Sequence, residues 1–359
     1  METEAPSRTG NGWTRVGKTL PVRNVQALAA CTDELTAECL ERYIRPDRDD
    51  GEVLSGEVPA IDLRRLLSPD HLEEEAARLR SACEDWGFFQ LVNHGIPDEI
   101  IANIKRDIQE FFKLPLEVKN VYAQRPGDIQ GYGQAFVLSE DQKLDWSDLF
   151  AIYAQPPEAR DLSYWPTHPQ TLRKSIEDYS SELMQVAHYV VTFIAKTLHI
   201  DTELMADKYV GQAFRMNYYP PCMSMAEKVL GFSPHSDGSF VTLLLQVNPV
   251  EGLQIRRHDA WIPVKPHPKA LLVNVGDFLE IMSNGAYKSV EHRVTINANQ
   301  ERLSISAFHF PLFDGTISPV TRTPEEKVLY KTMKVKEYAE LYMSNKLDGK
   351  RTLDHAKLL

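Results

Sequence analysis

Three residues in the last third of the chain have the types and spacing of metal ligands. His235 and Asp237 lie two positions apart in Ser-Pro-His-Ser-Asp-Gly, and His292 follows in Ser-Val-Glu-His-Arg-Val. Two imidazoles and one carboxylate form the facial ligand set that holds non-haem Fe(II) and leaves half of its coordination sphere open. A zinc hydrolase site is the alternative, because zinc uses the same ligand types. The pattern predicts a metal centre with room for small ligands.

A second group, Arg302 and Ser304, follows ten positions after the last histidine. A guanidinium presents a planar fork of donors that matches a carboxylate, and a hydroxyl two residues further along adds another donor. We expect this pair to bind a dicarboxylate co-substrate beside the metal. Phe308 continues the same alternation and is expected to face the same cavity as an aromatic floor.

Short β-strands are predicted to carry these residues. Side chains two positions apart in a strand share a face, so His235 and Asp237 are expected to point into one cavity from a strand entrance. A further segment, which ends at two prolines, places three polar side chains on one face: Arg215, Asn217 and Tyr219. An edge strand with a polar outer face is the alternative for that segment. Short strands that converge on one metal favour a barrel or jelly roll.

The other segments supply a helical frame around these strands. Amphipathic patterns predict helices over residues 69–86, 97–112, 169–198 and 335–345, with early strands over 58–63 and 88–93. We expect an α+β fold with a mainly β core, a double-stranded β-helix (jelly roll) with an N-terminal helical cover and a C-terminal helix. The expected regions are an N-terminal extension (1–55), helices with early jelly-roll strands (56–165), a long helical support (166–206), the jelly-roll core (207–315) and a C-terminal helical tail (316–359).

The composition of the chain argues against some classes of binding partner and indicates the cellular compartment. The chain has 359 residues and a formal net charge of −11, which argues against binding to nucleic acid or to an anionic membrane. Its start is polar and acidic without a secretory pattern, so we expect a cytoplasmic location. The four cysteines show no metal-binding or paired spacing and are expected to be free thiols: Cys31, Cys39, Cys83 and Cys222.

Taken together, these motifs resemble those of plant-type 2-oxoglutarate- and Fe(II)-dependent dioxygenases, of the clade with senescence-related-gene-type and codeine O-demethylase-like enzymes. The resemblance runs from about Val58 to the C-terminus and includes Cys83-Glu-Asp-Trp-Gly-Phe-Phe-Gln, Val92-Asn-His-Gly-Ile and Gly131-Tyr-Gly-Gln-Ala-Phe-Val. It implies Fe(II), 2-oxoglutarate and O2 as cofactor and co-substrates, with ascorbate as a candidate reductant. It assigns iron to His235, Asp237 and His292, and 2-oxoglutarate to Arg302, Ser304, Tyr219 and Asn217. The sequence has Cys222-Met223 where the family often carries Cys-Pro, but this position lies beyond the residues assigned to iron and 2-oxoglutarate.

The resemblance also implies a reaction. We expect a monomeric enzyme that hydroxylates a small hydrophobic plant specialised metabolite or hormone, or O-demethylates it by hydroxylation, and releases succinate and CO2. Phe308, Arg215 and Phe136 are the expected substrate-pocket residues. Arg215 is expected to meet a substrate carboxylate or hydroxyl, with a structural ion pair as the alternative. The alternative functions are an oxidase of the same fold that does not use 2-oxoglutarate, like aminocyclopropane-carboxylate oxidase, and a non-catalytic binding protein.

Overall fold

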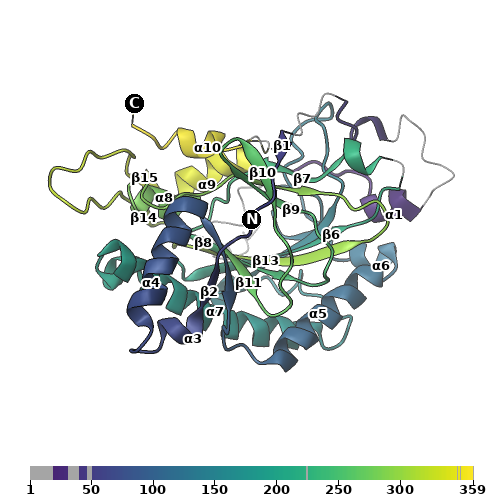
Figure 1. The fold of residues 1–359 in the computed structure, drawn as a ribbon. Helices are drawn as coiled ribbons and strands as arrows, with labels where there is room; N and C mark the ends of the chain where they lie inside the picture. Colours follow the sequence, from purple (N-terminus) through teal and green to yellow (C-terminus); the bar gives the residue numbers. More distant parts are fainter. Residues whose placement is uncertain are drawn as a thin grey trace, which may run out of the picture.

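Two β-sheets form the centre of the molecule in the computed structural model, which describes residues 19–30, 40–46, 51–223, 225–345, 347 and 349–358. Within these residues the larger sheet has eight strands, in the order β2-β3-β11-β8-β13-β6-β5-β4. The smaller sheet has five, in the order β1-β10-β9-β12-β7. Buried side chains from both sheets pack in one cluster, among them Phe88, Leu272, Phe232 and Val294. The expected jelly roll is confirmed (Figure 1).

The strand bounds follow the chain. The larger sheet contains β2 (Ala60–Asp62), β3 (Phe88–Val92), β4 (Gly131–Gly133), β5 (Asp148–Gln155), β6 (Gly211–Tyr219), β8 (Val241–Gln246), β11 (Leu271–Val275) and β13 (Arg302–Phe310). The smaller sheet contains β1 (Glu52–Val53), β7 (Leu230–His235), β9 (Leu253–Arg257), β10 (Ala260–Pro263) and β12 (His292–Thr295). A separate hairpin pairs β14 (Thr316–Ile317) with β15 (Met333–Lys334).

Strand register brings distant residues together. In the larger sheet the antiparallel pair β13·β6 places Arg302 opposite Tyr219 and Ser304 opposite Asn217. In the smaller sheet the pair β12·β7 places His292 opposite His235. Residues that alternate along each strand share a face, so both registers gather polar side chains in the space between the sheets.

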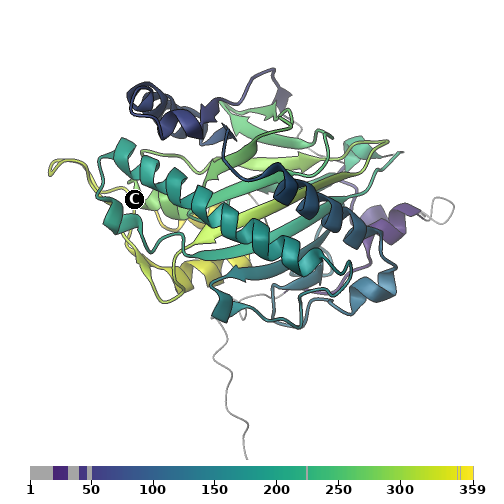
Figure 2. The ribbon, with the colours of Figure 1, turned by 90° about the horizontal axis from the view of Figure 1, so that it is seen from below.

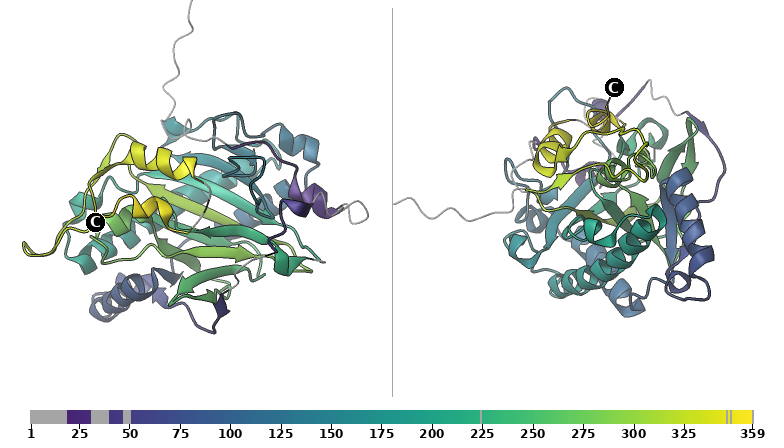
Figure 3. Two further views of the ribbon diagram at one scale, coloured as in Figure 1. Left: turned by 90° about the horizontal axis from the view of Figure 1, so that it is seen from above. Right: turned by 90° about the vertical axis from the view of Figure 1, so that its left-hand side faces the viewer.

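Helices cover the sheets from outside. The longest, α7 (Leu172–Leu198), buries an apolar face and runs beside α5 (Asp98–Lys113) across the larger sheet (Figure 2). The other α-helices of the described residues are α1 (Val25–Ala30), α3 (Leu63–Leu66), α4 (Leu72–Ser81), α6 (Leu116–Asn120), α8 (Asp277–Met282), α9 (Val335–Ser344) and α10 (Arg351–Asp354). The C-terminal helices α9 and α10 lie together on another side of the molecule (Figure 3). Among the described residues, no helix combines the length and apolarity needed to cross a membrane.

Several local expectations are confirmed and two are refined. The helix predicted over residues 69–86 consists of α4 followed by a π-helical turn at Ala82–Trp86. His235 ends β7 rather than entering a strand, and Asp237 lies in the turn between β7 and β8. Cys83 and Cys222 are buried free thiols, whereas Cys31 and Cys39 lie outside the described residues.

Candidate metal and co-substrate site

The three predicted ligands meet in the space between the two sheets. His235, Asp237 and His292 are buried, and one donor atom from each lies within 4.8 Å of the others. The Asp237 Oδ1 atom is 3.5 Å from the Nε2 atom of His235 and 3.7 Å from that of His292. No other group of three or more such side chains with this geometry occurs in the part of the chain that the structure describes.

Backbone hydrogen bonds fix which nitrogen of each imidazole is free. Nδ1 of His235 lies 2.8 Å from the Ser233 carbonyl, and Nδ1 of His292 lies 3.1 Å from the Val290 carbonyl. A carbonyl only accepts, so each Nδ1 carries the proton and each Nε2 presents a lone pair. The Nε2 atom of His235 is buried and has no hydrogen-bond partner in the described part of the chain. A buried nitrogen aimed at two other ligand atoms is the condition expected of a metal-binding imidazole.

Two polar side chains hold Asp237 in place. Its Oδ2 atom accepts hydrogen bonds from the Asn274 amide at 2.8 Å and the Thr242 hydroxyl at 2.7 Å, so Oδ1 faces the histidines. Neither residue was predicted from the sequence. A signal was present for Asn274, which is the polar residue within the apolar strand Leu271–Val275. Such partners orient ligands and tune their basicity.

Charge and burial in this cluster favour a neutral His292 beside an ionised Asp237. Burial would raise the pKa of Asp237, but the nearby His292 and His235 and the Asn274 amide outweigh it and hold that pKa below its usual range. Burial, with the neighbouring His235, lowers the pKa of His292 to about 4. Both protonation states are those that a divalent metal requires of its ligands.

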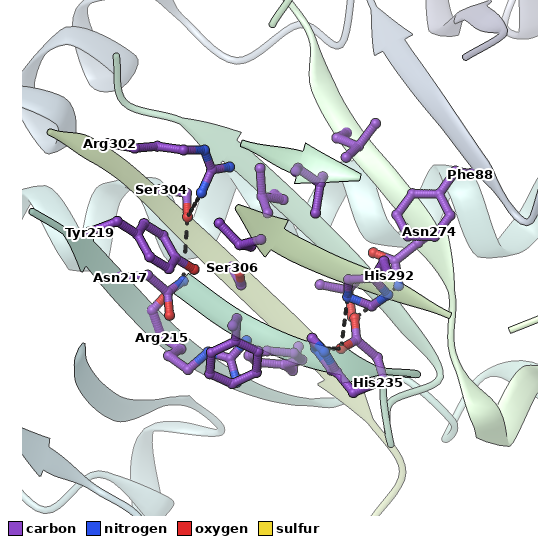
Figure 4. Close-up of a pocket in the computed structure, with 18 residues that line it drawn as sticks. Phe88, Arg215, Asn217, Tyr219, His235, Asn274, His292, Arg302, Ser304 and Ser306 are labelled. Carbon is purple, nitrogen blue, oxygen red and sulfur yellow. Dashed lines mark hydrogen bonds and ion pairs between the residues drawn. The ribbon is translucent and has the colours of Figure 1, made fainter. Parts of the chain in front are cut away.

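The other end of the pocket is built around Arg302. Figure 4 shows Arg302, Ser304 and Tyr219 at one end and His235 and His292 at the other. The guanidinium donates to the Gln246 side chain at 3.2 Å and reaches the Ser304 hydroxyl at 3.5 Å. It lies 5.2 Å from the centre of the Tyr219 ring. Burial lowers its pKa, and its Nε atom has no hydrogen-bond partner.

No carboxylate pairs with Arg302 among the described residues. Its hydrogen-bond partners are all neutral, although its side chain is almost fully buried. A buried charge is costly unless an opposite charge compensates it. The geometry therefore fits an anion that enters the pocket from outside the chain, since the described residues supply no such group.

Two glycines leave room for this end of the site. A Cβ atom at Gly231 would lie 2.7 Å from Cδ1 of Tyr219, and one at Gly252 would lie 2.9 Å from Cδ of Arg302. Both separations are shorter than side chains normally tolerate. Gly231 in β7 and Gly252 just before β9 therefore let the backbone approach the tyrosine and the arginine closely, because neither position carries a side chain.

The remaining predicted residues lie on the same strands or near them. Asn217 donates to the Ser304 hydroxyl at 3.4 Å. Arg215 on β6 and Phe308 on β13 line the same pocket as the metal ligands. Phe136 lies outside it, in an adjoining cavity, with a φ of 59° that is unusual for a non-glycine residue.

The arrangement can hold a divalent metal and, next to it, a small dianion. Besides the three candidate ligands, no carboxylate or imidazole lines this pocket within the described chain. A zinc hydrolase would need a general base beside the metal and would give the buried arginine no role. That alternative is disfavoured.

Comparison with known proteins gives two matching family models. Residues 58–171 match the model described as the N-terminal region of non-haem dioxygenases in morphine synthesis. Residues 210–311 match the model of the 2OG-Fe(II) oxygenase superfamily. The second match contains every candidate ligand and every residue around Arg302 named above.

Individual proteins agree over nearly the whole chain. A 2-oxoglutarate-dependent dioxygenase 11 from Oryza sativa subsp. japonica is 46% identical, with 94% of this chain and 97% of the relative covered. Codeine O-demethylase from Papaver somniferum is 42% identical over the full length of both chains. The crystal structure of JOX2 in complex with 2OG, Fe and JA superposes with a TM-score of 0.86 at 34% identity, covering 96% of this chain and 100% of that one.

Proposed function

Since the chain belongs to the plant-type 2-oxoglutarate- and Fe(II)-dependent dioxygenases, we propose that it oxidises a small, largely apolar metabolite or hormone at the site between its two sheets. Its cofactor is Fe(II), and its co-substrates are 2-oxoglutarate and dioxygen. The observation that carries the proposal is the buried Arg302, which has no acidic partner among the described residues and lies in the same pocket as the His-Asp-His cluster.

In this proposal the iron is held by Nε2 of His235, Nε2 of His292 and Oδ1 of Asp237. The support is the free lone pair on each imidazole and the fixed orientation of the carboxylate. When bound, the iron supplies oxidation by dioxygen coupled to the conversion of 2-oxoglutarate into succinate and CO2. Thr242 and Asn274 keep the carboxylate turned toward the histidines throughout.

Arg302 and Ser304 are proposed to bind the carboxylate of 2-oxoglutarate that is remote from the metal. The Arg302 guanidinium is already oriented by the Gln246 side chain and by the Tyr219 ring, so little conformational freedom is lost on binding. Asn217, which contacts Ser304, is proposed to lie nearer the metal-bound end of 2-oxoglutarate. Exclusion of water from this buried end strengthens the ion pair.

The reaction is proposed to be hydroxylation, or O-demethylation through hydroxylation of an O-methyl carbon. A relative named codeine O-demethylase supports the second outcome. We also propose a cytosolic location, which the buried free thiols of Cys83 and Cys222 support. We also propose that the enzyme acts as a monomer, since a single chain supplies every residue proposed for the site.

The proposal is tested by anaerobic reconstitution with Fe(II) and 2-oxoglutarate, admission of oxygen and incubation with a metabolite panel. A gain of one oxygen identifies hydroxylation, and the loss of one CH2 unit identifies demethylation, each with one succinate per product. Product without succinate would show an oxidase that does not use 2-oxoglutarate.

The matched control is His235→Ala, which we expect to lose both bound iron and turnover. Iron is measured by metal analysis after gel filtration, so that the readout does not depend on a known substrate. Retention of stoichiometric iron in this variant would contradict the assignment of the ligands.

A further inference from the structure

A second cavity adjoins the metal pocket and is almost entirely apolar. Its volume is about 130 Å³, and its walls come from β5, β6 and β13, the turn after β7, helix α9 and the loop that contains Phe136. Arg215 and Phe308 line both cavities and form the boundary between them. A molecule in the second cavity would therefore reach the metal site past these two side chains.

Arg215 is the one charged residue among the described residues that line this second cavity. The other residues that line it are neutral, most of them aliphatic or aromatic, and its polar side chains are those of Tyr153, Ser239 and Tyr342. The Tyr342 hydroxyl already donates to the Ser236 carbonyl. The cavity thus combines apolar walls with one cation beside the metal site.

The guanidinium of Arg215 is held by aromatic rings and not by an acid. Its central carbon lies 4.3 Å from the centre of the Phe232 ring and 4.9 Å from that of Phe308. Its Nε atom is buried without a hydrogen-bond partner. Neither an ion pair nor a hydrogen bond from this guanidinium to another described residue is present, so the expected alternative of a structural ion pair is not found.

Stacking on aromatic faces satisfies the π surface of a guanidinium and leaves its N–H edge available. A planar carboxylate is the group that pairs best with that edge, because two parallel hydrogen bonds form at once. A protonated amine in the same cavity would be desolvated beside a like charge, and the walls offer no carboxylate to compensate it.

We propose that the substrate of this enzyme is a largely apolar carboxylic acid, whose carboxylate binds the N–H edge of Arg215 while its apolar body fills the second cavity. This inference rests on the proposed function, because it places the substrate at the same metal site. It makes Arg215 a specificity-determining residue that selects acids over amines.

The test uses three probes with one apolar body: 1-naphthaleneacetate, 1-naphthaleneacetamide and 2-(1-naphthyl)ethylamine. Their binding to protein loaded with Fe(II) and 2-oxoglutarate is measured by calorimetry without oxygen. We expect the acid to bind at least about tenfold more tightly than the amine, which corresponds to one charge-assisted contact. The amide is expected to lie between them.

Arg215→Met should abolish the preference for the acid, and Arg215→Lys should keep part of it, since the charge remains but the fork is lost. Arg322→Met is the matched control, because Arg322 is half exposed and pairs with Glu326 away from the cavity. It should leave the preference unchanged. Three results would overturn the inference. They are an amine that binds as tightly as the acid, a preference for the acid that survives in Arg215→Met, and no binding by any probe.

A separate readout keeps this result distinct from the proposed function. Addition of 2-oxoglutarate to the iron-loaded Arg215 variants is followed by visible absorption. A normal response together with a lost acid preference supports the inference. A normal response in the wild type without any acid preference refutes the inference alone, whereas no response in the wild type refutes the proposed function.

Discussion

At the scale of single residues, the site depends on buried polar groups that lack some of their hydrogen-bond or charge partners among the described residues. His235 has one nitrogen bonded to a carbonyl and the other unpartnered, and Arg302 is buried among neutral partners. The sequence predicted these residues because ligand types and two-residue spacing are visible in it. It did not reveal Thr242 or Gln246, because their roles depend on which atoms they face across the sheet.

Replacement of Arg302 by lysine should weaken 2-oxoglutarate binding by about 10- to 100-fold, since a lysine offers one mobile charge in place of a fixed fork. Iron should stay bound, because Arg302 contacts none of the three ligands. Co-substrate affinity is measured by titration of the iron-loaded protein, with Arg322→Lys on the surface as the control. Unchanged affinity in Arg302→Lys would show that this guanidinium does not bind the co-substrate.

Gly231→Ala should weaken 2-oxoglutarate binding by about tenfold without loss of iron. Its Cβ atom would lie 2.7 Å from the Tyr219 ring and 2.9 Å from Cδ1 of Ile296, so the ring must leave the position in which it contacts Arg302. Adding Ile296→Val removes the second clash and should recover part of the affinity. The same titration measures both variants. An affinity for 2-oxoglutarate in Gly231→Ala equal to that of the wild type would show that the Tyr219 ring can accommodate the added methyl group.

At the scale of elements, distant segments are joined by single buried side chains. Helix α1 was not predicted, because residues 1–55 carry no strong periodic pattern, yet Asp148 accepts hydrogen bonds from the backbone amides of Val25 and Gln26. The first turn of this short helix is therefore stabilised by a carboxylate more than a hundred positions away in the sequence. By contrast, α5, α7 and α9 were predicted well because their apolar spacing is local.

Asp148 should make stability fall as pH rises. Burial raises its pKa from 3.8 to about 6, so its contribution to the free energy of unfolding is complete below about pH 4 and is lost as pH rises through 6. The linked loss is about 3 kcal/mol. Relative to Asp148→Asn, the wild type should therefore become less stable between pH 4.5 and 7.5, as measured by urea unfolding.

The exposed Asp141→Asn variant controls for general charge effects. Its stability profile should run parallel to that of the wild type over the same pH range. A profile for Asp148→Asn that also runs parallel to the wild type would show that the buried carboxylate has an ordinary pKa.

At the scale of the whole molecule, the site exists because two sheets face each other. His235 and His292 belong to the smaller sheet and Arg302 to the larger one, so the proposed metal and co-substrate sites lie across the interface between the sheets. The jelly roll could be predicted from converging short strands. The second cavity could not, because it needs α9 and the loop of Phe136 to meet over β6.

The most direct test is a titration of the iron-loaded protein with 2-oxoglutarate in the absence of oxygen, followed by visible absorption. We expect a charge-transfer band that saturates at one 2-oxoglutarate per chain, is absent in His235→Ala and needs far more 2-oxoglutarate in Arg302→Lys. An iron-loaded wild-type protein that shows no band at any concentration of 2-oxoglutarate would contradict the account.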